Sequence, residues 1–356
     1  MACSSASRPC LLSGPWREAS DVKIGLGMIT AQRPPGADLT DQQIYQDIIA
    51  LAVQAEANGF DSLWLSEHHF VDDGYMPSLL VVAAAVAVRT SVIGIGTGVL
   101  LAPFYHPLRL AEDAATVDLL SGGRLLLGIG TGWREEEFAG FGVPRTALGR
   151  RIELTVEAVR RAWNGEPTSA AEGAAPVRVT PQPAGGRRPP IWIGARSKPG
   201  IRRAARIADG FMAARVTPVA LAEQVGLLRD ALAELGRDPA EVTVSVHAPV
   251  FAWPGGDAWD LVREPYHYVE WKYQEMAAPA GHEQVPPPLT PAGQRELRSA
   301  GLVGTPEEVA ALIRQYRDAA GDDLHFVARL YWPGLDRDVQ REAIRVFASD
   351  VIPAVR

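Results

Sequence analysis

The stretch Ser62-Leu63-Trp64-Leu65-Ser66-Glu67-His68-His69-Phe70 begins as an apolar run and ends in one carboxylate and two imidazoles. The run has the composition of a buried strand, and the polar residues lie where that strand ends. In parallel α/β proteins, ligands bind at the carboxyl ends of the strands. The stretch therefore predicts a parallel strand that leads into the pocket of an enzyme.

Strand geometry separates the two histidines. Side chains alternate along a strand, so Trp64 and His68 share one face, while Leu63 and Leu65 share the other. The leucines suit packing beneath helices, which leaves His68 for the interior. A metal site built from both histidines is disfavoured because neighbours on a strand point apart and no third ligand stands at a known spacing. We expect a structural role for His69, with orientation of Glu67 as the alternative.

The rest of the chain repeats the order strand, then helix, eight times. Eight consecutive units predict a (β/α)8 TIM barrel, whereas a doubly wound sheet usually stops at five or six strands. We expect strands at residues 22–29, 62–66, 92–99, 124–130, 191–194, 210–215, 242–251 and 324–330. We expect helices at residues 41–58, 78–89, 107–120, 146–164, 199–208, 218–235, 306–319 and 337–347.

Two stretches are longer than barrel loops need to be. Residues 165–190, before the fifth strand, are rich in Ala, Pro and Gly and predict a flexible excursion. Residues 253–300, after the seventh strand, contain several Tyr and Trp residues, and loops of this length are often lids. A packed surface subdomain is the alternative for this second insertion. We expect residues 22–356 to form a single barrel domain.

Composition narrows the class of protein. The chain has 356 residues, 47% of them hydrophobic, and a formal net charge of -7, so it lacks the basic stripe that a nucleic acid requires. No apolar run is long enough to cross a membrane or to form the core of a signal peptide. Cys3 and Cys10 are the two cysteines, which supports neither a structural disulfide nor a zinc site. We expect a cytoplasmic protein in which residues 1–21 are a disordered extension or an artefact of start-site choice.

Glycine-rich strand ends give a second signal. The pentapeptide Gly-Ile-Gly-Thr-Gly occurs at residues 94–98 and again at 128–132. Neither copy is followed directly by a helix that would present its N-terminus to a pyrophosphate, which argues against a Rossmann site. One interpretation is that a flat ligand lies against the bare backbone. The alternative is that the glycines serve only strand ends and turns.

A third element follows the fifth strand. In Gly194-Ala195-Arg196-Ser197-Lys198-Pro199, Ser197 can cap a helix, and the basic residues add positive charge to a helix end that already favours anions. This arrangement suits a phosphate group. An ordinary capped helix with solvated side chains is the alternative.

Several of these stretches together carry a family resemblance, which runs from about Lys23 through the fifth helix. They are residues 60–70, 97–107, 111–113, 121–124 and 128–138. In this order they resemble the bacterial luciferase-like flavin-dependent monooxygenase family. The resemblance implies a (β/α)8 barrel that binds FMN, usually as FMNH2 from a separate flavin reductase, and uses O2 to oxygenate a small-molecule substrate through a C4a-(hydro)peroxyflavin.

The resemblance also assigns individual features. It makes His68 the catalytic base, places a non-prolyl cis peptide near Gly98-Val99, makes the insertion after the seventh strand a mobile lid, and suggests a homodimer. Histidine is suited to proton transfer near neutral pH, and an apolar, closed pocket shields reactive flavin species from water.

The combined site prediction has two further groups of residues and no metal. For cofactor binding we expect Thr97, Gly98, Val99, Gly130, Thr131, Gly132, Arg150, Gly194, Ala195, Arg196 and Ser197. For the substrate or lid we expect Met28, Trp133, Trp271, Arg329 and Trp332.

Two alternative functions remain open. One is a deazaflavin (coenzyme F420)-dependent oxidoreductase that transfers hydride; such relatives tend to carry an aspartate before a single histidine, so the Glu67-His68-His69 sequence argues against it. The other is a non-catalytic flavin-binding subunit, which the presence of His68 disfavours.

Overall fold

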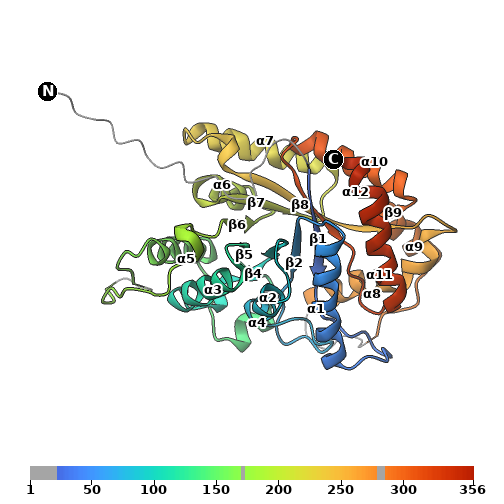
Figure 1. The fold of residues 1–356 in the computed structure, drawn as a ribbon, viewed down its shortest axis with the longest axis horizontal. Helices are drawn as coiled ribbons and strands as arrows, with labels where there is room; N and C mark the ends of the chain where they lie inside the picture. Colours follow the sequence, from blue (N-terminus) through green and yellow to red (C-terminus); the bar gives the residue numbers. More distant parts are fainter. Residues whose placement is uncertain (1–21, 170–172, 279–284) are drawn as a thin grey trace.

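Eight parallel strands form a closed barrel in the computed structural model, which describes residues 22–169, 173–278 and 285–356 (Figure 1). The barrel strands are β1 (Lys23–Ile29), β2 (Ser62–Leu65), β3 (Gly94–Thr97), β5 (Leu125–Gly130), β6 (Ile191–Gly194), β7 (Gly210–Ala214), β8 (Thr243–Ala252) and β10 (His325–Arg329). They pair in sequence order, and β10 pairs with both β1 and β8, which closes the ring. The predicted TIM barrel is confirmed, and the N-terminal extension predicted at residues 1–21 lies outside the described residues.

A helix follows each barrel strand, close to the predicted bounds. The helices are α1 (Asp41–Ala57), α2 (Leu79–Ala87), α3 (Pro107–Ser121), α5 (Leu148–Trp163), α6 (Lys198–Ile207), α7 (Pro218–Glu234), α10 (Pro306–Ala320) and α11 (Arg337–Val346), and the chain ends with α12 (Ile352–Val355). Local chemistry sets several ends: Thr40 and Thr305 form capping boxes, and Gly122 ends α3 with a φ of 70°.

The core has two layers that follow the alternation along the strands. Leu63 and Leu65 pack with the helices, whereas Trp64 packs inside the barrel against Trp192, with ring centroids 5.1 Å apart. A Cβ atom on Gly96 would come within 2.3 Å of the Trp64 ring. The predicted inward face of β2 is confirmed, and Gly96, in the first glycine repeat, makes room for a core tryptophan.

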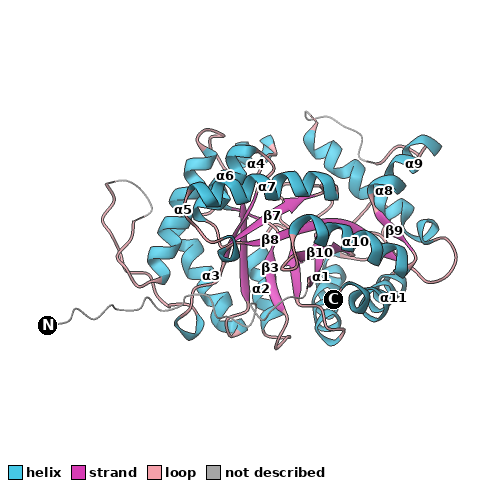
Figure 2. Ribbon diagram, turned by 90° about the horizontal axis from the view of Figure 1, so that it is seen from above, coloured by secondary structure: helices cyan, strands magenta, loops and turns pink. Residues whose placement is uncertain are grey.

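The two insertions differ in structure. Between residues 165 and 190, the described part contains an isolated bridge from Thr168 to Val177 and a short 3-10 helix, Ala184–Gly186. The insertion after β8 folds into α8 (Ala258–Ala277) and α9 (Pro291–Ala300), and β9 (Leu302–Gly304) then pairs with β8. Figures 1 and 2 show α8 and α9 together, at the opposite end of the molecule from α5.

Smaller elements were not predicted. They are β4 (Leu100–Leu101), α4 (Glu135–Gly140), and the 3-10 helices Ala102–Phe104 and Pro239–Glu241. A six-residue helix shows too little of the helical period to be recognised from sequence. Among the described residues, no helix combines the length and apolar character needed to cross a membrane.

Candidate active site at the barrel mouth

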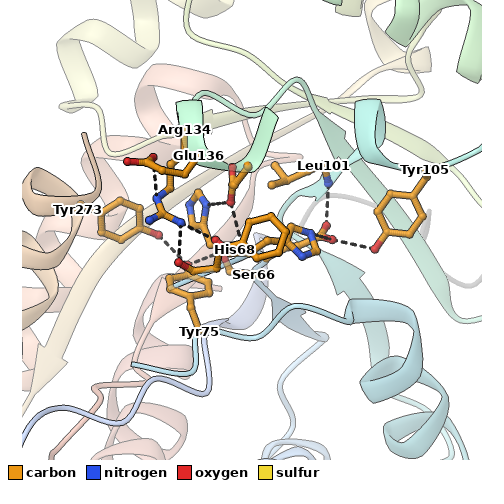
Figure 3. Close-up of polar contacts among 12 residues, drawn as sticks. Ser66, His68, Tyr75, Leu101, Tyr105, Arg134, Glu136 and Tyr273 are labelled. Atoms are coloured by element: carbon orange, nitrogen blue, oxygen red, sulfur yellow. Dashed lines mark hydrogen bonds and ion pairs between the residues drawn. The ribbon is translucent and has the colours of Figure 1, made fainter. Parts of the chain in front are cut away.

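His68 lies just beyond the end of β2, where the loop is held by a hydrogen bond from its backbone N–H to the Met76 carbonyl, 3.2 Å away. Its side chain is buried, and its Nδ1 lies 2.8 Å from Oε1 of Glu137 on α4 (Figure 3). The same carboxylate oxygen accepts the backbone N–H of His69 at 2.9 Å. With Nδ1–H donating to the carboxylate, Nε2 becomes the proton acceptor, and it makes no hydrogen bond within the described residues.

Glu137 is the residue of this candidate site that sequence reasoning missed. It is fully buried, and its Oε2 atom has no hydrogen-bond partner in the part of the chain that is described. In the sequence it is the last of three glutamates, and only the apolar Phe138 after it hints that this one points inward. Because 69 residues separate it from His68, their contact depends on the closure of the barrel.

A second carboxylate beside it has a different role. Glu67 accepts hydrogen bonds from the Tyr105 hydroxyl at 2.8 Å and the Leu101 N–H at 2.7 Å, and His69 Nε2 lies 2.9 Å away. Burial and the Glu67 carboxylate raise the pKa of Tyr105, so this phenol remains a donor. The Glu67 and His69 side chains therefore link the loops after β2 and β3, and the contact between them fits both the structural role expected for His69 and its alternative, orientation of Glu67.

Aromatic rings surround the imidazole of His68. Its ring centroid lies 4.9 Å from that of Tyr75, 5.4 Å from Trp133 and 6.0 Å from Tyr273. The Tyr75 hydroxyl hydrogen-bonds with those of Ser66 and Tyr273, each at 2.8 Å (Figure 3). Burial raises the pKa of Tyr75 well above its ordinary value, so its phenol stays neutral.

Helix α8 brings Tyr273 to the mouth and is anchored there. The Tyr268 hydroxyl donates to Asp73 at 2.6 Å, and Lys272 Nζ lies 2.5 Å from Asp72. Both aspartates belong to the loop after β2, so the helix is tied to the segment that carries His68. The aromatic insertion thus covers the active-site face, where the lid was predicted.

The predicted cofactor residues around the third strand meet at Val99. The Gly98-Val99 peptide is cis, as the resemblance implied, and Val99 is half-buried. A Cβ on Gly130 would lie 2.5 Å from Val99, and one on Gly194 would lie 2.9 Å from it. These glycines make room for Val99, so a flat ligand here would rest on the valine side chain.

The two predicted threonines are not equivalent. Thr97 is fully buried, and its hydroxyl donates to the Gly128 carbonyl at 2.7 Å. Thr131 is half-buried at the mouth, beside Gly132, whose φ of 69° places it in the left-handed region. Thr131 is therefore the more accessible hydroxyl.

The predicted phosphate residues lie in two places: Arg150 lies on α5, and Ala195, Arg196 and Ser197 lie at the start of α6. Ser197 caps this helix by accepting the Gly200 N–H at 3.3 Å, and Arg196 is exposed, as is Ser197 itself; Ala195 is half-buried. Arg150 pairs with Glu153 at 3.9 Å, and Glu153 also pairs with two arginines of α6. The cap is as predicted, and Glu153 links Arg150 to the same helix.

The residues predicted to face substrate or lid are divided between three places. Trp133, 38% exposed, lies beside His68, and Met28 is buried against Gly98. Trp332 packs on Tyr266 of α8 with ring centroids 4.9 Å apart, so it faces the insertion that was predicted to be a lid.

Trp271 packs on Tyr268, with ring centroids 5.8 Å apart. The aromatic side chain of α8 that contacts His68 is the nearby Tyr273 and not Trp271. Residues two apart on a helix point about 200° apart, which explains the difference. No group of three or more His, Cys, Asp or Glu side chains within the described ranges is arranged to hold a metal ion.

Comparison with known proteins identifies the family. The family profile described as luciferase-like monooxygenase matches residues 24–323. The chain belongs to this family. The resemblance recognised in the sequence is thereby confirmed, and the luciferase-like family contains oxidoreductases of two kinds, monooxygenases and F420-dependent dehydrogenases.

Two curated relatives represent these kinds. The oxygenase component of flavin-dependent trigonelline monooxygenase from Acinetobacter baylyi is 33% identical over 161 residues, 44% of this luciferase-like chain and 45% of the relative. The match therefore spans about half the length of this relative. An F420-dependent glucose-6-phosphate dehydrogenase from Kineococcus radiotolerans is 31% identical over 332 residues, 86% of this chain and 91% of the relative.

Solved structures support the fold. Monooxygenase RslO1 from Streptomyces bottropensis has a TM-score of 0.79 and 25% identity, covering 93% of this chain and 99% of that one. The oxygenating constituent of 3,6-diketocamphane monooxygenase from Pseudomonas putida, solved with FMN, has a TM-score of 0.74 and 21% identity, covering 95% and 99%.

Proposed function

We propose that this protein is an FMN-dependent monooxygenase that uses reduced FMN and O2 to oxygenate a small organic substrate. The observation that carries the proposal is the buried pair of His68 and Glu137 at the barrel mouth, 2.8 Å apart. A histidine oriented by a carboxylate is the arrangement of a general base. A reduced flavin would supply the electrons that activate O2.

The chain's own groups fit a flavin. The half-buried Val99 offers an apolar surface for a ring system, and Arg196, Ser197 and Arg150 offer positive charge and donors for a phosphate. We propose Gly98, Gly130, Thr131, Gly132, Gly194 and Ala195 as the backbone around the ring, with Thr97 holding the strand beneath it.

His68 would act at its Nε2 atom. Glu137 holds Nδ1–H, so Nε2 can take a proton from the reacting oxygen and return it. The rings of Tyr75, Trp133 and Tyr273 would exclude water from that atom.

Hydride transfer with deazaflavin is the second candidate. The relative from Kineococcus radiotolerans favours it, because the match covers most of both chains. The Glu67-His68-His69 sequence argues against it. A non-catalytic flavin-binding subunit is the third candidate, and the His68–Glu137 pair argues against a subunit without turnover.

We also propose two partners. A separate flavin reductase would supply FMNH2, which is supported by the relative that is named as an oxygenase component. A homodimer is supported by exposed valines: Val81 on α2 is 72% exposed, Val88 just after that helix is 62% exposed, and the nearby Val92 is 71% exposed. We propose a cytoplasmic location.

A mixing experiment tests the proposal. Purified protein is combined with reduced FMN and aerated buffer, and absorbance is followed in a stopped-flow instrument. A transient species before oxidised flavin returns is expected, and it should decay faster in His68→Ala. Absence of any transient in the wild type would contradict the monooxygenase proposal, and preferential binding of coenzyme F420 over FMN would favour the second candidate.

A further inference from the structure

Arg329 is a buried cation that has no counterion in the described part of the chain. It is the last residue of β10, and Val327, two residues earlier on the same face, lies in the cluster inside the barrel. Strand alternation therefore points Arg329 into the upper interior. Arg329 is 2% exposed, and its Nε and Nη2 atoms lack hydrogen-bond partners among the described residues.

The neighbours of Arg329 do not neutralise it. Its guanidinium carbon lies 5.7 Å from the Tyr273 ring centroid, and that of Arg215 lies 5.4 Å from the same ring. Arg215 has a carboxylate partner, Glu270 of α8. No acidic side chain of the described chain lies within ion-pair distance of Arg329. Leaving a charged group buried and unpaired is costly, so this site calls for an anion.

His247 adds a neutral hydrogen-bonding group beside it. It lies on β8, which pairs with β10, and both its neighbours, Val246 and Ala248, pack outward against the helices. Its ring therefore faces the interior. Burial and the nearby arginines, Arg329 first, lower the pKa of His247 to about 3, so it is uncharged near neutral pH and does not compete for the anion.

We propose that Arg329 binds an oxyanion of the substrate, so that the substrate class is small, carboxylate-bearing molecules. This rests on the proposed function, since it specifies the substrate of that site. The Tyr273 ring lies against both Arg329 and His68, and so connects these two side chains. The carboxylate would thus be held across the mouth from the reacting carbon, and aromatic walls favour a planar acid.

The flavin phosphate is the other oxyanion that Arg329 could bind. The start of α6, after β6, is separated from β10 by β7 and β8 in the barrel order. That separation favours α6 for the phosphate and Arg329 for the substrate.

Matched pairs of neutral and anionic probes test the assignment. Binding of benzoate, nicotinate, phenylacetate and cyclohexanecarboxylate, and of their four amides, is measured by calorimetry on the purified protein with and without FMN. At least one acid should bind ten or more times tighter than its amide. Arg329→Gln should abolish that preference while leaving amide binding unchanged, and Arg345→Gln, an exposed arginine on α11, should leave both unchanged.

Two outcomes would overturn the proposal. One is that no acid is preferred over its amide by the wild-type protein, a result that does not depend on whether the variant folds. The other is that Arg329→Gln weakens FMN binding and not riboflavin binding while the acid preference persists, which would assign the arginine to the phosphate. Because these measurements need neither O2 nor turnover, they can succeed or fail independently of the mixing experiment.

Discussion

The pairing of Glu137 with His68 gives the sharpest test of the site. In the wild type, Nδ1 of His68 and the backbone N of His69 lie 2.8 and 2.9 Å from the Glu137 carboxylate. In Glu137→Gln, the amide oxygen can still accept both hydrogen bonds, but the negative charge is lost. A hydrogen bond to a charged group contributes about 1.5–3 kcal/mol and a neutral one about 1 kcal/mol. The difference, about 0.5–2 kcal/mol at the histidine, corresponds to a factor of roughly 2 to 30.

We expect this factor in the decay rate of the transient species, measured by stopped-flow absorbance. An imidazole that Glu137 no longer holds firmly leaves Nε2 misplaced, so the transient species should decay roughly 2 to 30 times faster than in the wild type. The matched control is Glu136→Gln, one residue earlier on α4, whose side chain is 39% exposed and pairs with Arg134. In this control, the decay rate of the transient species should lie within about twofold of the wild-type rate, as expected for the loss of an exposed ion pair.

A double variant decides whether the two residues act as a unit. If they do, Glu137→Gln should add nothing in a His68→Ala background. Effects of the two substitutions that multiply in the decay rate would refute this, as would a transient species that decays no faster in Glu137→Gln than in Glu136→Gln. Urea unfolding of each variant checks that the fold is retained.

Three further predictions concern the surrounding structure. Gly130→Ala should lower the free energy of unfolding, measured in urea, by about 1–3 kcal/mol, because its Cβ would lie 2.5 Å from Val99. Adding Val99→Ala should recover most of this loss. An equal or greater loss in the double variant would contradict this contact. Burial lowers the pKa of His325 to about 4 from 6.5, so the unfolded chain binds a proton that the folded chain does not, and stability should fall as pH drops from about 6.5 to 4. His325→Gln should reduce this loss of stability at low pH, whereas His106→Gln, at an exposed histidine, should not. The free energy of unfolding is measured in urea at several pH values. If its slope against pH is the same in His325→Gln as in the wild type, His325 is ruled out as a source. Tyr105→Phe should cost about 1–2 kcal/mol in urea unfolding by removing one hydrogen bond to Glu67, with no change in the lifetime of the transient; a shortened lifetime would mean that Glu67 acts on the chemistry.

Much of the fold could be predicted because it depends on short-range patterns. The apolar runs and their spacing located all eight barrel strands, and alternation alone put Trp64 inside the barrel, where its ring meets Trp192. The same rule chose His68 over His69. Caps and glycines then set helix ends to within a few residues, as at Thr40 and Gly122.

The insertion after β8 shows where these patterns fail. Residues 253–300 were recognised as an aromatic insertion, yet α8 was not predicted, since Pro265 lies within it. Trp271 was expected to face the substrate or the lid, whereas Tyr273, which contacts His68, was not among the predicted site residues. Which face of α8 meets the barrel depends on its anchors to Asp72 and Asp73, some 200 residues earlier in the chain.

The sequence by itself determined the barrel, the order of its strands and the inward direction of His68, because backbone periodicity and side-chain alternation act between near neighbours. Only the tertiary structure decided that Glu137 holds His68, that Tyr273 covers it and that Nε and Nη2 of Arg329 lie buried with no hydrogen-bond partner among the described residues. Those three facts come from contacts, or their absence, between residues far apart in the chain. Such contacts depend on how the closed barrel brings its loops together, and no local pattern encodes that.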